Sequence, residues 1–193
     1  MMLIVWVDDW ICAYSSDAEM DDFMARMQRD IKCTFTREVK KFIGMEIERD
    51  PSDRYITLTQ TAYVTKLYET HAAGKNMKAW KNMTPTGTSI ADKEKFMGIA
   101  PITDKDEIAF NVERGYLRII GGIMYAMVFT RPDIAFHTSK LASCMHAPSN
   151  VAFEAALDLV RYLYHTRRLG ITFDGTNRSE VIEYTNPRCW VDA

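Results

Sequence analysis

The stretch that decides the fold covers residues 3–14 and reads Leu-Ile-Val-Trp-Val-Asp-Asp-Trp-Ile-Cys-Ala-Tyr. Two short runs of β-branched, aromatic and small apolar residues flank a bare pair of aspartates, which predicts a strand, a tight turn and a second strand. Both runs are apolar nearly throughout, as in strands that are buried on both faces of a sheet. The prediction is a β-hairpin that carries Asp8 and Asp9 at its tip, at the edge of a core.

The aspartate pair allows two interpretations. Aspartate is common in turns because its short side chain hydrogen-bonds nearby backbone groups and tolerates unusual backbone angles. Alternatively, the pair binds a divalent cation, since two negative charges about 4 Å apart repel by roughly 1 kcal/mol in water and about 4 kcal/mol at an effective dielectric near 20. Magnesium suits such a site because it prefers hard oxygen ligands, commonly one or two carboxylates together with substrate phosphates.

The composition is that of an ordinary globular chain, with 193 residues, 47% hydrophobic and 26% charged. This length allows one sizeable core or two small ones. The net charge of −2 gives no global sign of a polyanion partner, but residues 1–59 carry −4 and residues 60–170 carry +4. A carboxylate-rich part next to a basic part fits a metal site followed by a nucleic-acid cradle, although such an excess also arises by chance.

The cysteines and the apolar segments indicate an intracellular protein. Cys12, Cys33, Cys144 and Cys189 are far apart, without metal-ligand spacing, and are expected as reduced thiols. The apolar start is too short for a signal peptide, and no segment approaches the roughly 20 apolar residues of a membrane span. The sequence therefore predicts an intracellular location and no membrane partner.

Helices and strands alternate after the hairpin. Ser16 and Glu19 have the spacing of a capping box, and apolar residues recur at helical spacing up to residue 31. Residues 42–48 and 55–59 have the composition of two strands joined by a turn. Gly44 lies inside the first of these strands, where glycine marks either a bulge or a close approach of another backbone.

The second half of the chain is mainly helical. A short helix over residues 59–68 leads into a basic stretch with Lys75, Lys78 and Lys81, which either grips a single strand or forms a solvated loop. Residues 85–107 are expected to be a loose surface crossing. Three helices with short links then follow within residues 116–165, and Pro132 is placed to start the second of them.

Segments along the whole chain, in one order, resemble the polymerase region of copia-type retrotransposon reverse transcriptases. The first is Trp6-Val7-Asp8-Asp9, which is similar to the family's Tyr-x-Asp-Asp box, with Trp6 in place of the usual tyrosine. The others cover residues 42–47, 59–68, 116–125, 130–134, 161–171 and 189–193. The resemblance implies an α+β fold with a partial palm at 1–70, a linker or surface crossing at 71–115, a thumb-like helical region at 116–168 and the start of a ribonuclease H-like domain at 169–193.

The resemblance also implies the functional residues. Asp8 and Asp9 would be catalytic ligands of Mg²⁺, with Mn²⁺ as the alternative ion, and Asp192 would be the first metal ligand of the ribonuclease H site. Phe42, Ile43 and Gly44 would form a primer-grip-like segment. The candidates for nucleic-acid binding are Lys75, Lys78, Lys81, Arg161, Arg167 and Arg168.

The function implied is a part of an RNA-directed DNA polymerase, whose partners are an RNA template, a DNA primer and deoxynucleoside triphosphates. In this family the fingers and a further palm aspartate come earlier in the chain, so the fragment alone is expected to be inactive. Its location in an active element would be the cytoplasm or a virus-like particle. The alternative is a non-catalytic remnant that at most binds primer-template nucleic acid, and an unrelated metal hydrolase is a third, more distant possibility.

Overall fold

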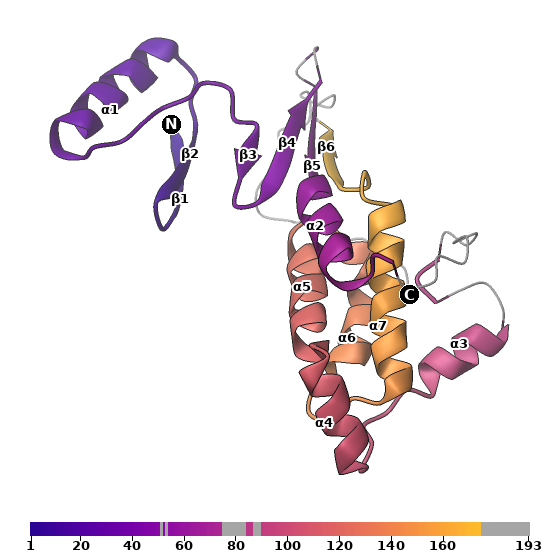
Figure 1. Cartoon of the computed structure of the whole chain (residues 1–193). Coiled ribbons are helices and arrows are strands. Elements are labelled where there is room, and N and C mark those ends of the chain that lie inside the picture. The colour runs from indigo at the N-terminus through magenta and orange to yellow at the C-terminus, as the bar shows by residue number, and fades with distance from the viewer. Residues whose placement is uncertain (51, 53, 75–83, 87–89, 175–193) are drawn as a thin grey trace, which may run out of the picture.

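The computed structural model describes residues 1–50, 52, 54–74, 84–86 and 90–174. In chain order the elements are β1 (Met2–Trp6), β2 (Asp9–Ala13), α1 (Asp17–Asp30), β3 (Lys41–Phe42), β4 (Met45–Arg49), β5 (Tyr55–Thr59), α2 (Thr61–His71), α3 (Ile90–Met97), α4 (Lys105–Glu113), α5 (Tyr116–Phe129), the 3-10 helix η1 (Pro132–Ile134), α6 (Ala135–Ala142), α7 (Asn150–His165) and β6 (Ile171–Asp174). Figure 1 shows two parts: an arm made of β1, β2 and α1, and a body in which a sheet sits above a bundle of helices.

The arm forms from local signals. Strands β1 and β2 pair antiparallel, and Ser16 caps α1 by accepting a hydrogen bond from the backbone N–H of Glu19 at 3.3 Å. The predicted helix start is therefore confirmed. Arg37, which follows α1, lies back across the first two turns of the helix and pairs with Asp17 and with Asp21.

The hairpin differs from its prediction in burial. Its strands form a two-stranded sheet of their own, and Ile4, Val5 and Trp6 are each more than half exposed. The expectation of strands buried on both faces is wrong for the described residues, because no further strand or helix covers both sides of this sheet. The apolar side chains of these strands therefore form an exposed surface, open to solvent or to a partner.

The body contains a four-stranded antiparallel sheet in the order β3-β4-β5-β6. The predicted pair of strands at 42–48 and 55–59 is confirmed in outline, but Gly44 lies in a turn rather than inside a strand. Ile43 and Gly44 both have positive φ, +49° and +71°, in a two-residue connection between β3 and β4. Consecutive positive φ values are typical of the tight turns whose twist matches a hairpin.

The core lies among the helices. Helices α2, α5, α6 and α7 supply most of the fully buried apolar side chains, among them Ile120, Leu141 and Leu157. Pro132 begins η1, as expected from its position. Among the described residues, no helix combines the length and apolar character needed to span a bilayer.

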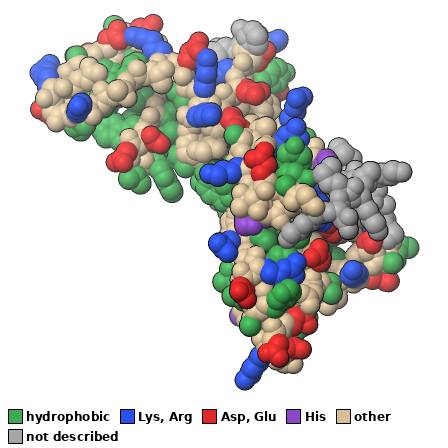
Figure 2. All heavy atoms as spheres, in the orientation of Figure 1, with side chains coloured by type: hydrophobic (Ala, Val, Ile, Leu, Met, Phe, Trp, Pro, Cys, Tyr) green, Lys and Arg blue, Asp and Glu red, His purple; other side chains and the backbone are tan. Residues whose placement is uncertain are grey.

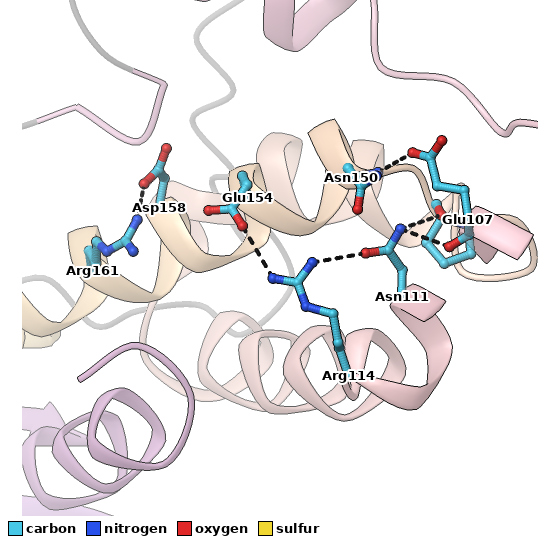
Figure 3. Close-up of polar contacts among 8 residues, drawn as sticks. Glu107, Asn111, Arg114, Asn150, Glu154, Asp158 and Arg161 are labelled. Carbon is cyan, nitrogen blue, oxygen red and sulfur yellow. Dashed lines mark hydrogen bonds and ion pairs between the residues drawn. The ribbon is translucent and has the colours of Figure 1, made fainter. Parts of the chain in front are cut away.

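Helices α3 and α4 replace the loose crossing that was expected over residues 85–107. Helix α4 is fastened to α7 by polar contacts (Figure 3): the Asn150 backbone N–H donates to Glu107 at 2.6 Å, and Arg114, at the C-terminal end of α4, donates to Glu154 at 3.4 Å. Arg114 also donates to Asn111 of α4 at 3.3 Å. Polar side chains at both ends of α4 therefore tie this helix to the bundle.

The physical units of the fold also cut across the expected domain boundaries. Helix α2, which was expected with the palm at 1–70, packs on α5 and α7 and shares their core. Strand β6, which was expected to open a ribonuclease H-like domain, pairs with β5 in the same sheet. The described chain thus consists of the arm and of one body that contains both the sheet and the bundle.

Candidate nucleic-acid and metal site

The aspartate pair lies at one end of the hairpin, but not in the arrangement expected. The turn is made by Val7 and Asp8, and Val7 has a φ of +51°. Asp9 is the first residue of β2 and pairs with Trp6. The prediction that both aspartates form the tip is therefore corrected: the register of β1 on β2 places only Asp8 in the turn.

Both aspartates line a large open cavity of about 1310 Å³ between the arm and the body. The predicted primer-grip-like residues Phe42, Ile43 and Gly44 line the same cavity. The fold thus brings together two groups of candidate residues that are more than 30 positions apart in the sequence. Figure 2 shows hydrophobic side chains gathered along the side of the arm that faces this space and at its junction with the body.

The donor chemistry of Asp8 and Asp9 fits a magnesium ion, because both offer carboxylate oxygens on an exposed surface. Two carboxylates leave most of an octahedral shell to water and to substrate phosphates. Among the described residues there is no group of three or more His, Cys, Asp or Glu side chains that could hold a metal ion. Asp192 lies outside the described residues.

Glu46, in the segment that resembles a primer grip, has a structural role that the sequence did not reveal. Its carboxylate accepts the backbone N–H groups of Thr61 at 2.6 Å and Ala62 at 2.9 Å, and the Thr59 hydroxyl at 3.1 Å. These two N–H groups open α2, where a helix leaves its first donors unpaired and favours negative charge. Glu46 therefore joins strand β4 to α2, and both Glu46 and Ala62 line the cavity.

The basic residues predicted to bind nucleic acid are not equivalent in the structure. The side chain of Arg161 is only 16% exposed and pairs with Asp158 one turn before it on α7. Arg167 donates to the carbonyl of Tyr164 at 2.9 Å and lies over the ring of that residue. Arg168 is exposed. Lys75, Lys78 and Lys81 lie outside the described residues.

Other basic side chains reach the cavity that contains the aspartates. Lys32, Lys41, Arg49 and Lys66 line it, and none of them was singled out from the sequence. Lys66 follows Tyr63, another lining residue, by three positions on α2, so the helical period places both on one face. That spacing is a signal in the sequence that could have identified Lys66, whereas the position of Lys41 depends on how the sheet packs on the bundle.

A buried polar network lies where η1 meets α7. Arg131 is 2% exposed and donates to both oxygens of Asp133, at 2.8 and 2.7 Å, and to the hydroxyl of Thr166 at 2.8 Å. The Tyr162 hydroxyl also donates to Asp133, at 3.0 Å. Burial by itself raises the pKa of the Asp133 carboxyl, but the hydrogen bonds and charge of Arg131 outweigh burial and hold this pKa below its ordinary value. The segment 130–134, which resembles a family motif, thus buries Thr130, Arg131 and Ile134 in the body and does not line the cavity.

Comparisons with known proteins give relatives that include retrotransposon Pol polyproteins. The chain is 26% identical over 92% of its length to a retrovirus-related Pol polyprotein from transposon TNT 1-94 of Nicotiana tabacum. It is 26% identical over 95% of its length to a retrovirus-related Pol polyprotein from transposon RE1 of Arabidopsis thaliana, and 24% identical over 89% to a transposon Ty5-1 protein of Saccharomyces cerevisiae. No family model matches the chain, and no solved structure matches it significantly.

These relatives support a retrotransposon-derived protein. The chain spans 13% of the length of the TNT 1-94 polyprotein, 12% of that of RE1 and 51% of that of the Ty5-1 protein. The similarity therefore concerns one part of a much longer polyprotein.

Proposed function

We propose that this chain, which is similar over most of its length to retrotransposon Pol polyproteins, is the palm and thumb part of a copia-type RNA-directed DNA polymerase. Asp8 and Asp9 hold Mg²⁺, or Mn²⁺, beside the primer end. One observation carries the proposal: the aspartate hairpin and the Ile43–Gly44 turn line one cavity, as a catalytic hairpin and a segment that holds the primer would. Two-metal nucleotidyl transfer supplies the chemistry in such a polymerase.

The second candidate is a non-catalytic chain that binds primer-template nucleic acid. It is favoured by the absence, among the described residues, of a third acidic or other metal-binding side chain near Asp8 and Asp9. Two-metal catalysis clamps the attacking and leaving oxygens between ions about 3.5–4 Å apart. One aspartate pair is a small ligand set for two such ions.

We predict that the chain alone does not extend a primer. Metal ions held in place beforehand stabilise the negative charge of the transition state in nucleotidyl transfer. The described residues contain no group of three or more side chains that could hold such an ion. The measurement is incorporation of deoxynucleotides on an oligonucleotide-primed RNA template with Mg²⁺ or Mn²⁺. The control is the Asp8→Asn, Asp9→Asn double variant, and incorporation above that control would contradict the prediction.

We also predict weak, salt-dependent binding of an RNA–DNA hybrid through the basic side chains of the cavity. Replacing Lys41 and Lys66 together by Gln should weaken binding about three- to tenfold at low salt and reduce the slope of log affinity against log salt by about 1 to 2, since each lysine neutralises one phosphate. Fluorescence anisotropy with a labelled hybrid at several salt concentrations measures both quantities.

The matched control replaces Lys93 and Lys105 by Gln. These lysines are exposed on α3 and α4, away from the residues that line the cavity, and their replacement changes the net charge by the same amount. Equal loss of binding in both double variants would mean that only net charge matters. Binding that is unaffected by the Lys41 and Lys66 changes would place the nucleic acid elsewhere.

A further inference from the structure

The Ile43–Gly44 turn lies between the cavity and helix α5. Both residues line the cavity that also contains Asp8 and Asp9. The turn joins β4 to β3, which has only two residues and forms the edge of the four-stranded sheet. So short an edge strand gives the turn little support from the sheet itself. Something else must fix its position.

Helix α5 supplies that support through one side chain. The hydroxyl of Tyr125 donates a hydrogen bond of 2.7 Å to the carbonyl oxygen of Ile43. A Cβ atom added to Gly44 would lie 2.6 Å from this hydroxyl oxygen, closer than side chains approach one another. Gly44 is thus required at this position both by its positive φ and by the closeness of Tyr125.

Tyr125 is itself held in place by the bundle. Its ring meets the ring of Tyr63 edge-on, with centroids 4.7 Å apart, and lies 4.7 Å from the ring of Phe129. The Tyr63 hydroxyl donates to the carbonyl of Gly122 at 3.0 Å, which ties α2 to α5 at the same level. Because side chains of α2 and α5 hold the Tyr125 ring, the turn is attached to a packed part of the body.

We propose that Tyr125 is a positioning residue that holds the Ile43–Gly44 turn against the bundle, in the orientation in which the turn contacts a bound primer strand. This role rests on the proposed function, because it takes primer-template nucleic acid as the ligand of the cavity. Tyr125 does not touch the ligand. It acts by keeping the edge hairpin in one orientation, so that binding does not have to order it.

The test compares two variants that lose the same kind of hydrogen bond. Tyr125→Phe removes the hydroxyl that holds the turn, and Tyr116→Phe removes one that donates to the Leu141 carbonyl at 2.8 Å inside the bundle. We expect amide hydrogen exchange of residues 43–46 to become about five- to tenfold faster in Tyr125→Phe and to stay unchanged in Tyr116→Phe, as loss of one such bond implies. We expect affinity for the RNA–DNA hybrid to fall about threefold or more in Tyr125→Phe only.

A second pair of variants tests the contact directly. Gly44→Ala should speed local exchange strongly in the natural background, because the new methyl group meets the hydroxyl oxygen at 2.6 Å. In the Tyr125→Phe background the nearest ring carbon is 3.6 Å away, an ordinary contact, so the additional effect of Gly44→Ala should be smaller. If Gly44→Ala speeds exchange equally in the two backgrounds, the contact between Gly44 and the Tyr125 hydroxyl does not hold the turn.

The outcomes for Tyr125 and for the proposed function can be told apart. Equal exchange of residues 43–46 in Tyr125→Phe and Tyr116→Phe overturns the positioning role, whether or not the hybrid binds. Faster exchange with unchanged hybrid affinity also overturns it, since the turn would then not matter to the ligand. If the unmodified chain does not bind the hybrid, the proposed function fails and the ligand-positioning role of Tyr125 fails with it, while the exchange data still decide whether Tyr125 holds the turn.

Discussion

Asp133→Asn should lower the free energy of unfolding by about 2 to 3 kcal/mol. The substitution removes the only carboxylate that Arg131 contacts among the described residues and leaves a guanidinium that is 2% exposed without a counter-charge. Breaking a buried ion pair from one side costs roughly 3–5 kcal/mol. We place the effect below that range because the Asp133 side chain is 38% exposed and solvent screens part of its charge. Urea denaturation followed by circular dichroism measures it.

The chain contains a matched control for burial. Asp22 and Arg26 form an ion pair of the same length, 2.7 Å, on the surface of α1, with both side chains more than 60% exposed. Asp22→Asn should change the free energy of unfolding by less than about 0.5 kcal/mol, as exposed helix pairs do. Similar effects of the two substitutions would show that burial of Arg131 does not govern the strength of its network.

The contribution of Asp133 to the free energy of unfolding should decrease as the pH falls. The pKa of the folded carboxyl lies below its ordinary value, so the unfolded state binds the proton more readily. The stabilisation by Asp133 is then fully present above about pH 4, the ordinary range for an aspartate, and is lost as the pH falls through the folded pKa. The stability difference between the unmodified chain and Asp133→Asn should therefore narrow under acid conditions. A difference that widens there would contradict this assignment.

The adjacent glycines of α5 should respond in opposite directions to the same substitution. A Cβ atom at Gly122 would lie 2.5 Å from a terminal carbon of Leu67, which is buried between α2 and α5, whereas a Cβ atom at Gly121 would meet nothing within 4 Å. Gly122→Ala should destabilise by about 1 to 3 kcal/mol through overpacking. Gly121→Ala should stabilise by up to about 1 kcal/mol, because alanine favours the helix.

The glycine pair thus predicts a difference of about 1 to 4 kcal/mol in the free energy of unfolding between neighbouring single variants. Thermal or urea denaturation of the two proteins measures it. The contact with Leu67 is tested by shortening that side chain: in a Leu67→Ala background the additional cost of Gly122→Ala should largely disappear. A cost that persists there would assign the effect to something other than the packing of α2 on α5.

The sequence by itself determined the features that depend on a few neighbouring residues. The capping role of Ser16 needs only the backbone N–H of Glu19, three positions away. The buried rows of α5 and α7 follow from the helical period, and the start of η1 follows from the fixed backbone angle of Pro132. The strand-turn-strand pattern around Asp8 and Asp9 was likewise visible, although the turn is displaced by one residue. These are local properties, because backbone angles and helical spacing set them within a few residues of chain.

Only the tertiary structure decided which surfaces meet. Gly121 and Gly122 are adjacent and the same residue type, yet the packing of α2 on α5 crowds Gly122 against Leu67 and leaves Gly121 open. The bond from Tyr125 to Ile43 spans 82 positions, and no periodicity encodes it. The β1–β2 hairpin is exposed although its strands are apolar. An apolar composition favours burial, but it does not say which element covers the surface. Burial and long-range contacts depend on which faces of separate helices and strands pack against one another. That packing is fixed only when the whole chain folds.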